Sequence, residues 1–342
     1  MQKYKIINLF FDIFALLRSN SRRTIVSARF FMRKLLIFLL SFFFSAMLSA
    51  RSADPAGENV LYTFWTAQSQ YAGYIIAEEE GLYKKEGLDL RVIHYDGTPS
   101  VTMLRERKTD FVSLTLLDAL DARKKGVDLV NIFQLTHQSS YLVVSRDKPL
   151  RSLKDLEGKD VVTNRSFNST LRKEITRRLS GNVTISEVYA CVQVFLAGAY
   201  DYIICTSYHE LCELEESGFR INMDNVLKLG ENGFDIPEDG IYVLRSFLEE
   251  NPTKVEKFVK ASAEGWKRVT KDPEHSLPYT LERMARDNVV RNRYHERRMV
   301  EVFTQLQGKD NDFKLRREEF ERAAAFYSEE FRESVNFESF VR

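Results

Sequence analysis

From residue 59 onward the chain alternates between short β-rich runs and helical segments. Residues 60–65 are rich in β-branched and aromatic side chains, a helix is predicted over 74–83, and an alternating strand follows at 88–93. The same order of strand and helix continues through residues 110–145. Strands separated by helices favour a largely parallel sheet with helices on both faces. The pattern therefore predicts an α/β protein.

A second, smaller β/α block is predicted between two stretches that carry Gly or Pro and polar residues, as domain boundaries and hinges often do. These stretches, 146–150 and 230–237, are candidates for two crossings between lobes, and residues 240–244 form a return strand after the second crossing. We therefore predict two β/α lobes joined by a two-crossing hinge, with a small-molecule site in the cleft between them. The predicted boundaries are residues 53–147 with 235–342 for lobe 1, and residues 148–234 for lobe 2.

The first 52 residues are predicted to be a targeting segment. Arg33 and Lys34 precede the apolar run 35–44, which small residues follow. A positive region, a short apolar run and a small-residue exit are the three parts of a secretory signal. The run is also shorter than the roughly 20 residues of a membrane span. We expect export to the periplasm, and the alternative is an uncleaved segment that anchors the protein to the membrane.

The charge distribution argues against a nucleic-acid partner. The chain has 50 Lys and Arg and 49 Asp and Glu, but eight of the basic residues and one of the acidic residues lie in residues 1–50. The remainder is therefore acidic, whereas binding to a phosphate backbone needs a basic face. Three cysteines are too few for a disulfide scaffold.

Sequence motifs for catalysis are missing. The five histidines show no metal-binding spacing, and the sequence contains no phosphate-binding loop and no nucleophile elbow. We therefore expect a protein that is not an enzyme, with no metal and no cofactor. His137 and Cys205 are the pair that could be argued as a base and a nucleophile.

Four segments, in order and at family spacing, resemble the substrate-binding proteins of the thiamine-precursor/alkanesulfonate type, in the thiamine pyrimidine-synthase-like superfamily. They are Gln68–Tyr74 with Glu79–Leu90, Asp110–Leu120, Leu153–Lys159 and Ile236–Leu244. The resemblance runs from about residue 60 to residue 280. It implies a bilobal periplasmic-binding-protein fold of type II. It also implies a monomer that delivers a small-molecule ligand to the membrane permease of an ABC importer.

The chain departs from this family at one loop. Members that hold a phosphate carry glycines after the first strand of the second lobe, where backbone N–H groups can approach phosphate oxygens. Residues 163–169 contain no glycine here, although Arg165 could still meet an anion. The yeast pyrimidine-synthase relatives also have a clustered-cysteine iron site, and nothing in this sequence resembles it. An enzyme of that type is therefore the less favoured interpretation.

The candidate ligand-binding residues follow predicted strands or flank the predicted crossings, because open α/β sheets bind ligands at the carboxyl ends of their strands. Aromatic rings offer flat faces to a planar ligand, while carboxylates accept hydrogen bonds from an amine and repel an anion. The candidates are Trp65, Gln70, Tyr71, Thr115, Asp118, Gln134, Asn164, Arg165, Tyr208, Glu238 and Asp239. Some also have a structural interpretation: Trp65 as core filler, Asp118 as a helix cap, and Glu238 and Asp239 as a solvated turn.

These residues predict a neutral or weakly basic planar heterocycle as the ligand, a thiamine-pathway pyrimidine or a relative. Two other binding functions stay open. One is an alkanesulfonate- or taurine-type anion-binding protein that uses Arg165. The other is a ligand-sensing extracytoplasmic module, which would differ in its partner.

Overall fold

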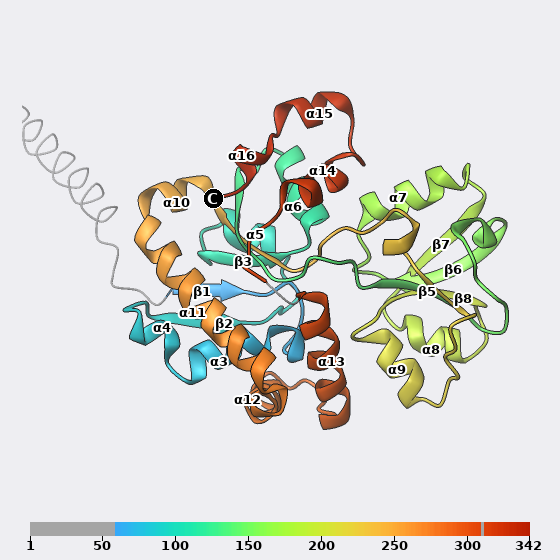
Figure 1. The fold of residues 1–342 in the computed structure, drawn as a ribbon, viewed down its shortest axis with the longest axis horizontal. Coiled ribbons are helices and arrows are strands. Elements are labelled where there is room, and N and C mark those ends of the chain that lie inside the picture. The colour runs from blue at the N-terminus through green and yellow to red at the C-terminus, as the bar shows by residue number, and fades with distance from the viewer. Residues whose placement is uncertain (1–58, 309–310) are drawn as a thin grey trace, which may run out of the picture. The chain divides into compact units, whose positions relative to one another are not determined.

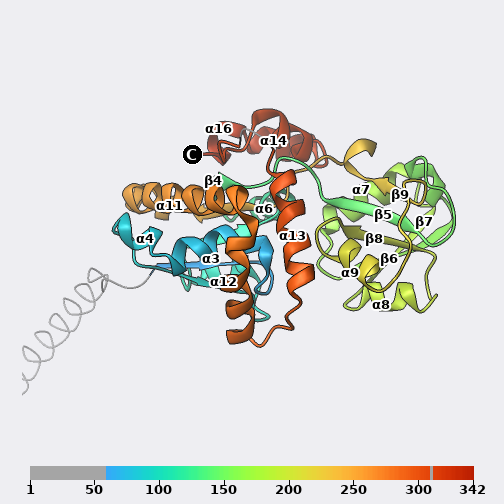
Figure 2. The same cartoon turned by 60° about the horizontal axis from the view of Figure 1, so that its bottom comes forward.

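The computed structural model describes residues 59–308 and 311–342, and the predicted targeting segment 1–52 lies outside these residues (Figures 1 and 2). The described chain forms two five-stranded sheets covered by helices. This is the predicted α/β periplasmic-binding-protein architecture. Within the described residues, no helix combines the length and the apolar character needed to cross a membrane.

The first sheet has the order β2-β1-β3-β10-β4. Its strands are β1 Asn59–Tyr62, β2 Leu90–Ile93, β3 Phe111–Leu114, β4 Leu129–Gln134 and β10 Gly240–Leu244. Its early helices are η1 Ser69–Tyr71, α3 Ala72–Glu79, α4 Leu82–Lys85, α5 Ser100–Arg105 and α6 Leu116–Lys124. The helices after β10 are α10 Arg245–Glu250, α11 Pro252–Lys271, α12 Pro273–Arg286, α13 Arg293–Leu306, α14 Arg317–Ala324, α15 Glu329–Ser334 and α16 Phe337–Phe340.

The second sheet has the order β7-β6-β8-β5-β9. Its strands are β5 Tyr141–Ser145, β6 Lys159–Asn164, β7 Val183–Val188, β8 Tyr202–Thr206 and β9 Val226–Lys228. Its helices are η2 Leu153–Leu156, α7 Ser169–Arg178, α8 Cys191–Leu196, α9 Glu210–Glu216 and η3 Gly230–Asn232. Figure 1 shows these elements in green and yellow, beside α13.

Both sheets are mixed, so the expectation of largely parallel sheets was wrong. In the first sheet β1 pairs parallel with β2 and β3, but β10 runs antiparallel to β3 and β4. In the second sheet β6 pairs parallel with β7 and β8, but β5 runs antiparallel to β8 and β9. The antiparallel strands β10 and β5 are the first strands that the chain forms after it passes from one sheet to the other.

The first passage between the sheets comes earlier than expected. Strand β4 ends at Gln134 in the first sheet, and β5 begins at Tyr141 in the second, so the chain crosses over residues 135–140 and not over 146–150. The second passage connects β9 to β10 and includes the expected stretch 230–237. Residues 141–147 therefore leave predicted lobe 1, and the other lobe boundaries stay predictions.

Two glycines allow α11 to lie directly against α3. A Cβ atom on Gly265 would lie 2.1 Å from the carbonyl oxygen of Gly73, and one on Gly73 would lie 2.4 Å from the Trp266 ring. The Trp266 ring is fully buried and meets Tyr74 edge-on, with 5.6 Å between the ring centroids. Because α3 continues directly from η1, this packing fixes the segment that carries Gln70 toward the cleft.

Candidate ligand-binding site

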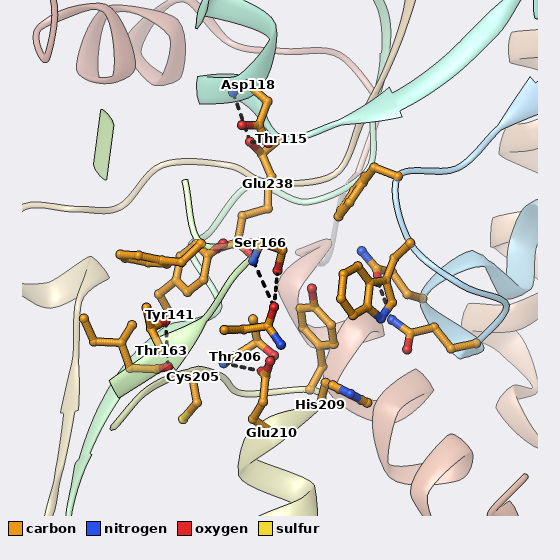
Figure 3. A pocket seen from close by; sticks show the side chains of 18 residues that line it. Thr115, Asp118, Tyr141, Thr163, Ser166, Cys205, Thr206, His209, Glu210 and Glu238 are labelled. Carbon is orange, nitrogen blue, oxygen red and sulfur yellow. Dashed lines mark hydrogen bonds between the residues drawn. The ribbon is translucent and has the colours of Figure 1, made fainter. Parts of the chain in front are cut away.

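A pocket lies between the two sheets and is lined by residues from both (Figure 3). It contains about 640 Å³ of empty space, part of it open to solvent. The lining residues are Phe64, Trp65, Gln68, Gln70, Thr115, Asp118, Tyr141, Thr163, Asn164, Ser166, Phe167, Ile204, Cys205, Thr206, Tyr208, His209, Glu210 and Glu238. Most of them lie at or within a few residues of the carboxyl ends of β1, β3, β6 and β8, which all open toward the cleft.

The loop between β1 and η1 supplies one wall of the pocket. Trp65 is half-buried and lies parallel to the ring of Tyr95, with 6.3 Å between the centroids and 7° between the planes. Behind it, the Gln68 side-chain amide donates to Gln70 Oε1 at 2.5 Å, and Gln70 Nε2 donates to Asp239 Oδ1 at 2.7 Å. This chain of hydrogen bonds fixes the amide orientation of both glutamines.

The start of α6 forms a second part of the wall and contacts the other sheet. Thr115 caps this helix: its Oγ1 accepts from the backbone N–H of Asp118 at 3.1 Å and donates to Asp118 Oδ2 at 2.6 Å. Asn168 Nδ2, at the start of α7, donates to Asp118 Oδ1 at 2.6 Å. Burial raises the pKa of the Asp118 carboxyl. The cap is therefore Thr115, and Asp118 joins the two lobes across the cleft.

The second sheet contributes polar groups at the ends of β6 and β8. Asn164 Oδ1 accepts from the backbone N–H and the hydroxyl of Ser166, both at 2.9 Å. Glu210 Oε2 accepts from the backbone N–H of Thr206 at 2.9 Å and from its hydroxyl at 2.5 Å. Tyr208 packs edge-on against Phe303 of α13, with 4.7 Å between the ring centroids.

Glu238 connects the two crossing segments. Its Oε1 accepts from the backbone N–H of Ser140 at 2.8 Å and from the Ser139 hydroxyl at 3.1 Å, and its Oε2 accepts from the Ser140 hydroxyl. Burial raises the pKa of Glu238 to about 8, against the effect of these hydrogen bonds. Burial also raises the pKa of the neighbouring Asp239 to about 7, against the bond from Gln70. Two consecutive residues at the hinge therefore carry carboxyl groups whose pKa values are raised.

The described lining residues include five aromatic and three acidic side chains beside mostly neutral polar ones, with no Lys or Arg among them. Their rings come from Phe64, Trp65, Tyr141, Phe167 and Tyr208, and their carboxyl groups from Asp118, Glu210 and Glu238. Flat aromatic faces favour a planar ligand, and carboxyl groups accept N–H donors and disfavour an anion. Within the described part of the chain, no group of three or more His, Cys, Asp or Glu side chains is arranged to hold a metal ion.

The model of the NMT1/THI5-like family matches residues 68–276, which include most of both pocket walls. The chain belongs to the NMT1/THI5-like family. It is 23% identical over 247 residues to the riboflavin-binding protein RibY of Chloroflexus aurantiacus, which covers 68% of each protein.

Solved structures share the fold. A protein of Bordetella bronchiseptica RB50 superposes with a TM-score of 0.62 at 18% identity, over 83% of this chain and 94% of that one. The alkanesulfonate-binding protein SsuA of Xanthomonas axonopodis pv. citri, bound to MOPS, superposes with a TM-score of 0.56 at 14% identity, over 80% of this chain and 92% of that one. At these identities the similarity establishes the periplasmic-binding-protein fold of this NMT1/THI5-like protein.

The pocket brings together most of the residues that the sequence singled out. Those that line it are Trp65, Gln70, Thr115, Asp118, Asn164, Tyr208 and Glu238. Trp65 is half-buried at the pocket wall and is not core filler, and Glu238 and Asp239 are buried and do not form a solvated turn.

The other candidates lie outside the pocket lining. Tyr71 is fully buried next to Phe64 and His94. Gln134 is fully buried and donates to the backbone carbonyl groups of Thr136 and Asp239. Asp239 lies behind Gln70, to which it is hydrogen-bonded.

Arg165 is exposed, and its guanidinium lies over the ring of Tyr189 at 5.0 Å from the centroid. The proposed anion-binding role of Arg165 in the pocket therefore has no geometric support.

Several lining residues were not among the candidates predicted from the sequence. They are Phe64, Gln68, Tyr141, Thr163, Ser166, Phe167, Ile204, Cys205, Thr206, His209 and Glu210. Thr206 and Glu210 end a strand and begin a helix, so the rule that selected Thr115 and Asp118 in the first lobe would also have selected them. Tyr141 could not be found in this way, because it begins a strand and reaches the pocket through the early crossing.

Proposed function

We propose that this protein is an extracytoplasmic solute-binding protein that binds a neutral or weakly basic planar heterocycle and delivers it to the permease of an ABC importer. The observation that carries the proposal is the pocket itself, with aromatic rings, three carboxyl groups and no Lys or Arg among its described lining residues. The fold of the family and the riboflavin-binding relative RibY support it. A thiamine-pathway pyrimidine is the preferred ligand, and an isoalloxazine ring fits the same class.

The two walls of the pocket have different roles in this proposal. Trp65, which lies parallel to Tyr95, lines the pocket from the first lobe and would stack on an aromatic ring of the ligand, and Tyr208 lines it from the second lobe. Glu210 and Asp118 accept hydrogen bonds from an exocyclic amine. Glu238, whose pKa burial raises to about 8, lines the pocket with its oxygens bonded to Ser139 and Ser140.

Binding requires no chemical step in this account. A ligand that contacts both walls binds the closed arrangement of the lobes better than the open one, so it shifts the population toward closure. The permease then receives the closed, loaded form. We further propose that the protein acts as a monomer and that residues 1–52 direct its export.

An anion-binding function receives less support from this pocket. A sulfonate group needs cationic or N–H donors, whereas Arg165 stacks on Tyr189 outside the pocket lining. Two raised carboxyl pKa values at the hinge would be raised further by a bound anion, because like charges disfavour ionisation. The alkanesulfonate-type interpretation is therefore retained only as an outcome of the test.

A thermal-shift panel tests the ligand class. It should contain 4-amino-5-hydroxymethyl-2-methylpyrimidine, riboflavin, taurine, MOPS and arginine. We expect stabilisation by one of the two heterocycles, with binding weakened roughly tenfold in Trp65→Ala because a stacking partner is lost. Tyr189→Ala, which removes an exposed ring outside the pocket, is the matched control and should bind like the wild type. Stabilisation by a sulfonate alone, insensitive to Trp65→Ala but lost in Arg165→Ala, would overturn the proposal.

A further inference from the structure

A pair of histidines connects helix α9 of the second lobe to helix α13. His209 Nδ1 lies 3.0 Å from His295 Nε2, and the two rings are perpendicular, with 5.0 Å between their centroids. On its other side, His295 Nδ1 lies 3.1 Å from Glu216 Oε1, and Asn292 Nδ2 donates to Glu216 Oε2 at 2.9 Å. His209 lines the pocket, whereas His295 is buried behind it. The connection therefore links the ligand pocket to a buried ring on α13, the helix that lies beside α9 in Figure 1.

The positions of the hydrogen atoms follow from the partners. The ionised carboxylate of Glu216 can only accept, so Nδ1 of His295 carries a hydrogen atom. When His295 is neutral, its Nε2 has none and accepts from Nδ1–H of His209, so Nε2 of His209 is an acceptor. When His295 is an imidazolium, its Nε2–H donates to Nδ1 of His209, so the hydrogen atom of His209 is on Nε2. One proton taken up by the pair thus converts the free nitrogen of His209 from an acceptor into a donor.

We propose that His295 is a positioning residue of the ligand pocket, which fixes the ring of His209 and decides whether that ring offers the ligand an acceptor or a donor. The inference rests on the proposed function, since it takes the pocket to be the ligand site. A second proton on the pair places two cations against each other and breaks the N···N hydrogen bond. The link between α9 and α13 is then weakened, and the cleft opens more easily.

The surroundings of the pair are acidic on both helices. The facing charged groups are Glu210, Glu213, Glu215 and Glu216 on α9, and Glu296 and Arg298 on α13. Glu213 Oε1 lies 4.0 Å from Nε2 of His209, and Arg298 is paired with Glu215 at 2.6 Å. Glu296 accepts from the backbone N–H of Ser69 in η1 at 2.6 Å. A carboxylate therefore lies beside each ring of the pair.

Nitrogen-15 NMR of the purified protein, labelled at its histidines, reports the tautomer of both rings in the absence of a ligand. As the pH falls from 8.5 to 5, we expect His209 to change from the Nδ1–H to the Nε2–H tautomer. This change should disappear in His295→Gln. It should persist in the control His275→Gln, because the His275 ring bonds to Glu80 at the end of α3 and not to the pair. The same tautomer behaviour of His209 in His295→Gln and in the wild type would overturn the proposal.

Glu216→Gln gives an independent test, in case His295→Gln does not fold. It keeps both imidazole rings but removes the charge that stabilises the first proton, so the tautomer change should move to lower pH. An unchanged midpoint would contradict the proposed role of His295.

Riboflavin serves as the probe of binding over the same pH range, and its binding is measured by the quenching of its fluorescence. His295→Gln should weaken its binding about three- to tenfold at pH 7.5, the effect of one hydrogen bond, and should flatten the pH dependence. An unaltered pH profile in this variant would overturn the link to the pocket. If riboflavin does not bind the wild type, the ligand assignment fails for riboflavin, while the NMR result still decides the role of His295.

Discussion

Replacing Glu238 by Gln should change how the stability of the protein depends on pH. The pKa of Glu238 is raised by burial from its ordinary value of 4.5 to about 8. Such a carboxyl group has a higher pKa in the folded protein than in the unfolded chain. It contributes its full stabilisation at pH values below the pKa of the unfolded chain, and this contribution is lost as the pH rises through the pKa of the folded protein. Between pH 5.5 and 8.5 the loss is on the order of 3 kcal/mol, since one pKa unit corresponds to about 1.4 kcal/mol.

The side-chain amide introduced by Glu238→Gln retains the hydrogen bonds of the protonated acid. Its oxygen can accept from Ser139 and Ser140, and its NH₂ group can donate to the Ser140 hydroxyl, but the amide does not ionise. The stability of Glu238→Gln should therefore lack this pH dependence. Its free energy of unfolding relative to that of the wild type should rise by on the order of 3 kcal/mol between pH 5.5 and pH 8.5, as Glu238 of the wild type ionises.

Urea denaturation followed by circular dichroism at both pH values measures this difference. Glu231→Gln is the matched control, because Glu231 is exposed and paired with Lys228 on the surface. The control should follow the wild type at both pH values. Parallel pH dependence in Glu238→Gln and the wild type would refute the reasoning about the hinge carboxyl group.

Three further predictions concern packing and closure. Gly265→Ala should lower the free energy of unfolding by about 2 kcal/mol or more, measured by urea denaturation, because its Cβ would lie 2.1 Å from the backbone oxygen of Gly73; stability equal to the wild type would contradict the packing of α11 on α3. Asn168→Asp keeps an oxygen that caps α7 but places a carboxylate against Asp118 of the other lobe. Because like charges repel, the cleft should open, and small-angle scattering at pH 8 should show a larger radius of gyration for this variant than for the wild type. A saturating ligand should decrease the radius of gyration of the wild type, and an unchanged radius would count against closure of the cleft.

The order of strands and helices could be predicted from the sequence, but their directions could not. Strands β4 and β10 are almost completely buried, and a buried strand has the same apolar composition whether its neighbours run parallel or antiparallel. Whether β5 pairs with β4 or with β8 depends on contacts with residues about 60 positions away, such as Tyr141 with Thr206. Such long-range pairing leaves no local signal, so the first crossing was placed too late.

The sequence predicts that the pocket lies at the ends of the strands, but it does not predict which single side chains line it. Glu238 lines the pocket while Asp239 contacts Gln70 behind it, because successive side chains of an extended segment point to opposite sides. Choosing between the two requires the register of β10, which only the folded sheet defines. Arg165 was misplaced for a different reason, because its stacking on Tyr189 depends on the pairing of β6 with β7.

Mass spectrometry of the protein purified without added ligand is the most direct test of the central claim, because binding proteins of this architecture can retain their cargo. Native spectra should show a bound small molecule, and denaturing spectra should identify it as a neutral or weakly basic aromatic heterocycle. The same preparation of Trp65→Ala should contain much less of it. A retained sulfonate, or an aromatic ligand held equally well by Trp65→Ala, would contradict the account.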